Sequence, residues 1–189
     1  LVDAGIKKIE AVSFVNPKVV PQMADAEEVM KLVPRVDGVK YAGLILNYSG
    51  MERAMKTDVD IFHIVTTTSD AFNLKNARKT VDQNVAEHIT VIQEAVAAKR
   101  PVTGVLGTAF GCPYSGEVPV DRVLEISEAF VKAGASEIVL ADTTGLANPV
   151  QVAEVVNRFQ RHYGDDIKLG LHFHNTRGLG LANVLAGYQ

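Results

Sequence analysis

The sequence has 189 residues, of which 47% are apolar and 22% charged, and its formal net charge is −3. This composition is that of one globular domain and leaves too little chain for two well-packed domains. The charges form no runs, and no apolar stretch approaches the ~20 residues that a membrane-spanning helix needs, so neither nucleic acid nor a membrane is an expected partner.

Short β-branched or apolar runs alternate along the chain with longer segments of helical periodicity. The expected strands are Lys8–Ser13, Tyr41–Leu46, Ile61–Thr67, Val102–Thr108, Ile138–Ala141 and Lys168–His174. The expected helices are Ala26–Leu32, Gly50–Lys56, Leu74–Lys99, Val120–Ala133, Pro149–Tyr163 and Leu179–Tyr188. Strict alternation predicts a parallel sheet with right-handed crossovers in a single domain, residues 1–189. The first residues, 1–5, are expected to end a helix, and residues 178–189 to begin another.

Two architectures fit such a sheet: an open doubly wound sheet and a closed (β/α)8 barrel. An open nucleotide-binding sheet has a glycine-rich phosphate loop after its first strand, and this sequence has none. A barrel gathers functional side chains at the carboxyl ends of its strands. Polar residues occupy those positions at Glu10, Ser13, Asn47, Thr66 to Ser69, Thr108, Asp142 to Thr144 and His172 to Asn175. We therefore favour an α/β fold of the TIM-barrel type, with six of its eight strand units visible and sequence missing at one or both ends.

His172 and His174 are two residues apart in a strand, so both imidazoles project from the same face. Two neutral imidazoles side by side are plausible ligands for one divalent metal ion. The alternative is that one ring packs in the core while the other bonds a backbone carbonyl. Two ligands alone do not complete a site, so the pattern by itself is suggestive only.

Two carboxylates lie in otherwise apolar surroundings. Glu10 interrupts an apolar strand, where it needs a hydrogen bond, a cation or a metal, unless it lies on an edge and faces water. Asp142 follows the run Ile138–Ala141. It is a candidate to orient a metal ligand or a substrate hydroxyl, or else it caps the helix near Asn148 or bonds its own turn.

Cys112 and three basic residues have less specific signals. Cys112 lies near a strand end, but the sequence shows no adjacent base, so packing is the favoured role. Lys18, Lys75 and Arg78 are candidates to hold a carboxylate or a CoA phosphate, with exposure on a solvated face as the alternative for each. A single cysteine excludes an internal disulfide and suits a reducing compartment.

Several motifs together resemble the 3-hydroxy-3-methylglutaryl-CoA lyase family, in register along essentially the whole chain. The most specific is the segment Ser-Phe-Val-Asn-Pro-Lys at residues 13–18, followed by Val-Pro-Gln-Met-Ala-Asp at residues 20–25. The others are Gly-Cys-Pro-Tyr at 111–114, Ala-Asp-Thr-Thr-Gly at 141–145 and His-Phe-His-Asn-Thr at 172–176. The Asp-Thr and His-x-His elements are shared with the wider metal-dependent aldolase, lyase and synthase superfamily.

The resemblance implies a barrel seen from the end of its first helix to its seventh helix. It implies that His172 and His174 are metal ligands, for Mg²⁺ or Mn²⁺, and that Glu10, Asp142 and His172 are catalytic. The polar strand ends Ser13, Asn47 and Thr108 are the expected substrate contacts. An Arg-Asp pair would lie upstream of Leu1, and an Asn ligand and a catalytic cysteine beyond Gln189, so Cys112 is not that cysteine.

The implied activity is metal-dependent cleavage of 3-hydroxy-3-methylglutaryl-CoA, or a close 3-hydroxyacyl-CoA, to acetyl-CoA and acetoacetate or another ketoacid. Leu46 stands where the family has proline and Ser115 where it has glutamate, so the acyl group stays open. A related aldolase or Claisen-type synthase is one alternative, and a non-catalytic barrel subunit is another. We expect an acyl-CoA substrate, a homo-oligomer (dimer or tetramer), and location in the cytoplasm of a bacterium or the mitochondrial matrix of a eukaryote.

Overall fold

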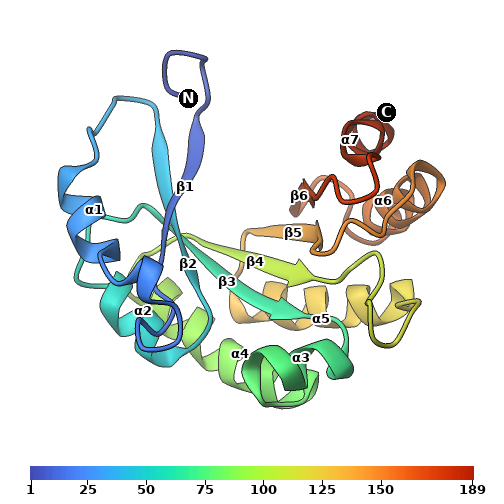
Figure 1. The fold of residues 1–189 in the computed structure, drawn as a ribbon, viewed down its shortest axis with the longest axis horizontal. Coiled ribbons are helices and arrows are strands. Elements are labelled where there is room, and N and C mark those ends of the chain that lie inside the picture. Colours follow the sequence, from blue (N-terminus) through green and yellow to red (C-terminus); the bar gives the residue numbers. More distant parts are fainter.

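The computed structural model describes residues 1–189 and contains one sheet of six parallel strands, ordered β1-β2-β3-β4-β5-β6 along the chain. The strands are Lys8–Ser13 (β1), Lys40–Ile45 (β2), Ile61–Thr67 (β3), Val102–Gly107 (β4), Glu137–Asp142 (β5) and Lys168–Phe173 (β6). Every neighbouring pair is consecutive in sequence, which is the order of a barrel and not of a doubly wound sheet. The sheet curves into a half-barrel (Figure 1).

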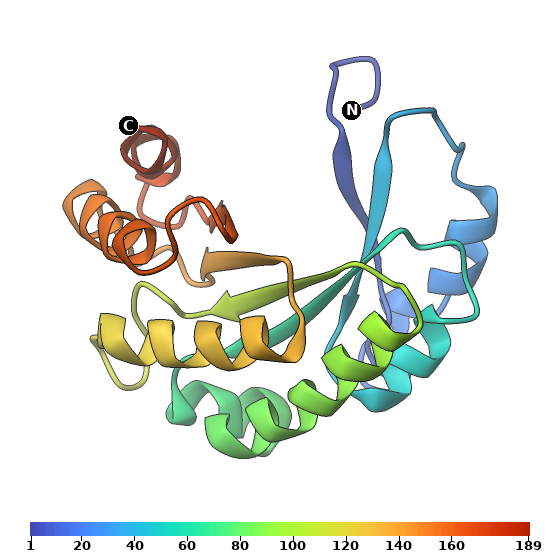
Figure 2. The same ribbon diagram turned by 180° about the vertical axis from the view of Figure 1, so that it is seen from behind.

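The helices lie on the convex side of the sheet and leave the concave side open (Figures 1 and 2). They are Ala26–Leu32 (α1), Tyr48–Ala54 (α2), Asp70–Ala77 (α3), Val81–Ala97 (α4), Val120–Ala133 (α5), Pro149–Tyr163 (α6) and Gly180–Tyr188 (α7), with a 3-10 turn at Pro21–Met23 (η1). This strand–helix alternation confirms the predicted α/β fold of a partial TIM barrel.

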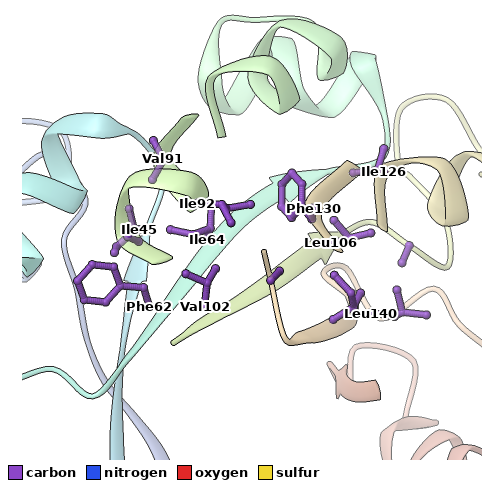
Figure 3. Packing of buried hydrophobic residues seen from close by; sticks show 14 of the residues in the cluster. Ile45, Phe62, Ile64, Val91, Ile92, Val102, Leu106, Ile126, Phe130 and Leu140 are labelled. Carbon is purple, nitrogen blue, oxygen red and sulfur yellow. The ribbon is translucent and has the colours of Figure 1, made fainter. Parts of the chain in front are cut away.

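Side chains alternate along each strand between the helix layer and the concave face. Phe62 and Ile64 of β3 are both fully buried and pack beneath α4 with Ile92 (Figure 3). His63 between them therefore points to the concave face. Strand pairing aligns this face in one row across the sheet, formed by Ser13, Leu44, His63, Thr103, Glu137 and Lys168.

The structure corrects the single long helix that periodicity predicts over Leu74–Lys99. The segment forms two helices, α3 and α4, separated at residues 78–80. Arg78 adopts a left-handed conformation (φ 58°) that ends α3. Thr80 then starts α4 with a capping box: its hydroxyl accepts from the backbone N–H of Gln83, whose side chain accepts from the N–H of Thr80.

Two element ends bear on the sequence predictions. Residues 1–5 form hydrogen-bonded turns in which the backbone N–H of Ile6 donates to the carbonyl of Leu1 and that of Gly5 to the carbonyl of Val2. With Gly5 at φ 82°, this is the pattern with which helices commonly end, so it fits the expected helix end. β6 ends at Phe173, so His174 lies just beyond the strand. No helix in residues 1–189 has the length and apolar character needed to cross a membrane.

Candidate active site

His172 and His174 come together at the carboxyl end of β6. Their Nε2 atoms are 3.1 Å apart, and their ring centroids are 4.9 Å apart. Because β6 pairs with β5 along its whole length, with His172 opposite Ala141, the strand fixes where the ring of His172 emerges, and His174 follows directly after the strand. Both residues are exposed, so a bound species has access to the pair.

The spacing of the two ring nitrogens fits joint coordination of one cation. Two nitrogen ligands about 2.1 Å from an ion and at a right angle to each other are about 3.0 Å apart. No group of three or more His, Cys, Asp and Glu side chains in residues 1–189 is arranged to hold a metal ion, so this pair by itself would not complete a metal site. The role of His172 and His174 as ligands stays a prediction that this geometry fits.

Four influences set the pKa of His172: its partial burial, His174, Glu10 and Asp142. Burial lowers the pKa of His172, and His174 lowers it further, whereas Glu10 and Asp142 act in the opposite direction. The net result is a pKa below the usual value, which favours the neutral imidazole that coordinates metals. The two carboxylates predicted as catalytic are thus close enough to His172 to influence its charge.

Asp142 is fully buried at the end of β5. One of its carboxylate oxygens accepts from the backbone N–H of Leu146 at 2.8 Å, and the other accepts from that of Ala147 at 3.2 Å. It therefore bonds its own turn, one of the roles open from the sequence, while Asn148 caps α6. The catalytic role of Asp142 stays a prediction.

Glu10 has a partner that the sequence did not indicate. Its Oε2 lies 2.5 Å from Nδ1 of His63, and its side chain is 44% exposed. Both alternatives for Glu10 hold in part: it forms this hydrogen bond, and it also lies on an edge strand of the sheet with an exposed side chain. The sequence contained one signal for His63: an ionisable residue between Phe62 and Ile64 in an apolar strand, as Glu10 is in its own.

The three predicted substrate contacts differ in position. Ser13 lies on the concave face at the end of β1, half-buried. Asn47 caps α2 by accepting from the N–H of Gly50 at 2.9 Å, and it also lines a cavity. Thr108 is fully buried, and its hydroxyl lies 3.1 Å from that of Thr68. The structure places only Ser13 and Asn47 where a substrate has access, and all three roles stay predictions.

A cavity of about 430 Å³ opens beside Asn47, at the carboxyl ends of β2 and β3. Its basic side chains come from the last turn of α3 and from the segment that joins α3 to α4: Lys75, Arg78 and Lys79. Lys79 forms an ion pair with Glu87, and Lys75 lies 4.7 Å from the ring centre of Tyr114, whereas Arg78 has no carboxylate partner. Lys18 does not line this cavity.

A larger cavity, of about 550 Å³, lies near Phe110 and α6. Its charged lining consists of Glu117, Glu154 and Arg177. Two carboxylates against one cation make it unfavourable for an anion, so the smaller basic cavity is the better candidate for an anionic ligand.

Cys112 is buried in the loop after β4. The hydroxyl of Ser69 donates to its sulfur at 3.0 Å, and the backbone N–H of Tyr114 lies 3.4 Å from it. Burial raises the pKa of the thiol, but hydrogen bonds led by those of Ser115 and Ser69 outweigh burial and hold the pKa below its usual value. None of these partners is a base, so a structural role stays the prediction.

Fold and site together define a partial (β/α)8 barrel with a pair of histidines at the carboxyl ends of its strands. The entire chain, residues 1–189, matches the HMGL-like family, and it belongs to that family. The family is generally metal-dependent.

Individual relatives and solved structures agree with this family membership. The chain is 37% identical over 185 residues to the hydroxymethylglutaryl-CoA lyase YngG of Bacillus subtilis, covering 98% of this chain and 62% of that protein. It is 34% identical over 199 residues to the (R)-citramalyl-CoA lyase of Chloroflexus aurantiacus, covering all of this chain and 62% of that protein. A structure of an HMG-CoA lyase from Acinetobacter baumannii, in complex with coenzyme A and 3-methylmalate, superposes with a TM-score of 0.91 at 41% identity, covering 96% of this chain and 59% of that one. The chain thus spans about 60% of the length of these relatives.

Proposed function

We propose that residues 1–189 form part of a single TIM-barrel catalytic domain in a metal-dependent acyl-CoA lyase. The reaction is retro-Claisen cleavage of 3-hydroxy-3-methylglutaryl-CoA, or a close 3-hydroxyacyl-CoA, to acetyl-CoA and acetoacetate or the corresponding ketoacid. The observation that carries this proposal is the His172–His174 pair, 3.1 Å apart at the carboxyl end of β6, with the Glu10 carboxylate near it.

The chemistry requires residues of these types. The 3-hydroxyl of the substrate loses its proton, the bond between C2 and C3 breaks, and C3 becomes the ketone carbon of the ketoacid. The electron pair of that bond passes to C2 and forms the thioester enolate, which takes a proton to give acetyl-CoA. A divalent ion such as Mg²⁺ or Mn²⁺, when bound, supplies charge that favours the alkoxide and orients the substrate.

In this reaction the residues of the chain have three proposed roles: cation binding, proton transfer and positioning of a loop. His172 and His174 would hold the cation through Nε2. Glu10 has a half-exposed carboxylate on the concave face, which suits it to accept or deliver a proton at the substrate hydroxyl. Asp142 holds the loop beside His172 and keeps negative charge near it.

The basic cavity is the proposed position of the CoA phosphates. Its volume of about 430 Å³ is in the range of small-molecule sites. Arg78 is the most available cation there, because Lys79 is paired with Glu87. It has φ 58°, a conformation that glycine adopts without strain.

Arg78→Gly therefore removes the charge at little backbone cost. We expect the KM for acyl-CoA to rise about tenfold, which is roughly 1.4 kcal/mol of binding, with little change in kcat. Lys99→Gly is a matched control, because Lys99 also has a positive φ (60°) and is exposed, but it follows α4 at the opposite end of the barrel. An equal rise in KM for both variants would contradict the proposed phosphate site.

The acyl group is the open part of the proposal. The relative from Chloroflexus aurantiacus is named for citramalyl-CoA, and the structure from Acinetobacter baumannii contains 3-methylmalate. A substrate close to hydroxymethylglutaryl-CoA, such as another branched 3-hydroxyacyl-CoA, is therefore the second candidate. The proposed assembly is a dimer or tetramer, and the proposed compartment is the cytoplasm in a bacterium or the mitochondrial matrix in a eukaryote.

The deciding experiment assays the metal-loaded full-length protein against a panel of 3-hydroxyacyl-CoA esters that includes both candidates. Release of acetyl-CoA is followed with Mg²⁺ or Mn²⁺ present, and with Glu10→Gln as the control of reduced activity. We expect cleavage of at least one ester, and cleavage that is slower by roughly a hundredfold but still measurable in the control. If no member of the panel releases acetyl-CoA, the lyase assignment is wrong.

A further inference from the structure

His63 is a buried ionisable residue on the concave face of the sheet. Only 8% of its surface is exposed. Its neighbours Phe62 and Ile64 belong to the apolar layer under the helices (Figure 3). Its own imidazole therefore occupies the interior of the half-barrel, the same face that carries Glu10.

The contact between His63 and Glu10 crosses an intervening strand. Glu10 is on β1 and His63 on β3, with β2 between them. The residue of β2 that pairs with Glu10 is Ala42, which is fully buried. Its methyl group is small enough to let the two longer side chains meet above it, where Nδ1 and Oε2 are 2.5 Å apart.

The contact with Glu10 indicates which ring nitrogen of His63 carries the hydrogen. A carboxylate oxygen accepts, so Nδ1 carries the hydrogen that it donates to Glu10. Nε2 of His63 is buried and has no hydrogen-bond partner. A hydrogen on Nε2 would be left unsatisfied, so the contact favours the neutral Nδ1–H tautomer.

The neighbouring polar groups do not compete for His63. Thr103, its partner on β4, donates instead to Glu137 at 3.0 Å. Glu137 also forms an ion pair with Lys8. The side chain of His63 therefore has Glu10 as its one hydrogen-bond partner. The ring contacts Oε2 of Glu10 and does not restrain Oε1.

We propose that His63 is a positioning residue for Glu10, whose hydrogen bond to Oε2 directs Oε1 toward the substrate beside His172. This inference rests on the proposed function, because it assumes that Glu10 acts on the substrate. A carboxylate on a flexible side chain has several rotamers, and fixing one of them raises the fraction of molecules in which the proton acceptor is in place.

The kinetic test compares two variants of the full-length protein. His63→Leu removes the donor, and we expect kcat to fall at least tenfold with KM within twofold. His63→Asn places an amide N–H close to the position of Nδ1, and we expect it to restore most of kcat. A rise in KM for His63→Leu without loss of kcat would overturn the proposal, and so would a His63→Asn variant whose kcat stays as low as that of His63→Leu.

A double-mutant cycle separates positioning from packing. In a Glu10→Ala background the His63→Leu change should have no further effect on kcat, because the residue through which it acts is gone. If His63→Leu costs the same factor in both backgrounds, His63 acts independently of Glu10 and the proposal fails.

A measurement without turnover distinguishes this proposal from the proposed function. In protein labelled with ¹⁵N-histidine, the ring nitrogens of His63 should report the Nδ1–H tautomer, and Glu10→Ala should remove that preference. This result would support the contact even if no acyl-CoA were cleaved. An Nε2–H tautomer in the unmodified protein, or a tautomer unaffected by Glu10→Ala, would refute the contact whether or not the lyase activity is found.

Discussion

His172 and His174 can be tested as ligands one ring at a time. If their Nε2 atoms, 3.1 Å apart, share one ion, then His174→Ala leaves a single imidazole. We expect affinity for Mn²⁺ to fall at least tenfold, or about 1.4 kcal/mol, in a titration followed by electron paramagnetic resonance. His162→Ala, which removes an exposed histidine on α6, serves as the control. Unchanged affinity in His174→Ala would rule out the shared site.

Cys112 is a second prediction at the residue scale. Its sulfur is buried and contacts the Ser69 hydroxyl, and no base lies among its hydrogen-bond partners. Cys112→Ser should therefore keep turnover within about tenfold of the unmodified protein, a change of less than roughly 1.4 kcal/mol in the barrier. A greater loss of kcat with an unchanged free energy of unfolding would show that the thiol takes part in the reaction.

What sequence can predict about single residues depends on the separation between partners. The His172–His174 pair could be inferred because two residues apart in a strand means one face. The Glu10–His63 contact could not be inferred, because it joins positions 53 residues apart and requires a small residue, Ala42, on the strand between them. The role of Asp142 could not be decided from the sequence, because an aspartate directly after a strand can equally bond its own turn or contact a ligand.

Among the elements, the break between α3 and α4 was not predicted from the sequence, which indicated one helix over Leu74–Lys99. The apolar periodicity continues across residues 78–80, and neither glycine nor proline marks the stop. The break is made instead by the left-handed conformation of Arg78 and the capping box at Thr80. Buried side chains stabilise it: the amide of Asn73 donates to the backbone carbonyls of Lys79 and Thr80. Because this break forms the basic cavity, the missed feature is also functional in our proposal.

His88 of α4 makes this region sensitive to pH. It is fully buried, and its Nε2 lies 3.1 Å from the carbonyl oxygen of Leu46. Burial lowers its pKa from 6.5, so the folded protein holds it neutral more strongly than the unfolded chain does. The unfolded chain then binds the proton more readily, and the stability due to His88 is complete above pH 6.5 and decreases as the pH falls below that value.

The test is the variant His88→Gln, whose amide can still donate to Leu46 but does not titrate. The urea midpoint of the unmodified protein should fall more between pH 7.5 and pH 5.5 than that of the variant. Because both proteins share every other titrating group, the difference between them isolates His88. Equal pH dependence in the two proteins would contradict a buried neutral His88.

At the scale of the whole molecule, the topology was predictable because each strand is followed by a helix that returns the chain to the start of the next strand. Such a chain adds strands in sequence order or divides them about a switch point, and the absence of a phosphate loop favoured the first. The curvature followed from the choice of a barrel over an open sheet. The side-chain contacts across the concave face could not be predicted, because they join residues as distant in sequence as Lys8 and Glu137.

The Lys8–Glu137 pair gives a prediction that separates stability from catalysis. Lys8 begins β1 and Glu137 begins β5, so their ion pair crosses three intervening strands at the amino-terminal end of the half-barrel. Thr103 adds a hydrogen bond to the same carboxylate at 3.0 Å. In barrels the amino-terminal end serves stability, whereas the carboxyl end, where His172 lies, serves catalysis.

Glu137→Gln keeps an acceptor for the Thr103 hydroxyl but removes the negative charge that forms the ion pair with Lys8. We expect it to lower the free energy of unfolding by about 1–2 kcal/mol, the range for a partly buried charged hydrogen bond, and to leave kcat within twofold. His174→Ala, at the other end, should do the reverse: it should lose metal binding and keep its urea midpoint. Both variants are measured in the full-length protein by urea unfolding and by acetyl-CoA release. A Glu137→Gln protein that unfolds at the same urea concentration as the unmodified protein would show that the ion pair does not stabilise the contact between β1 and β5. A large loss of kcat would show that Glu137 takes part in the reaction.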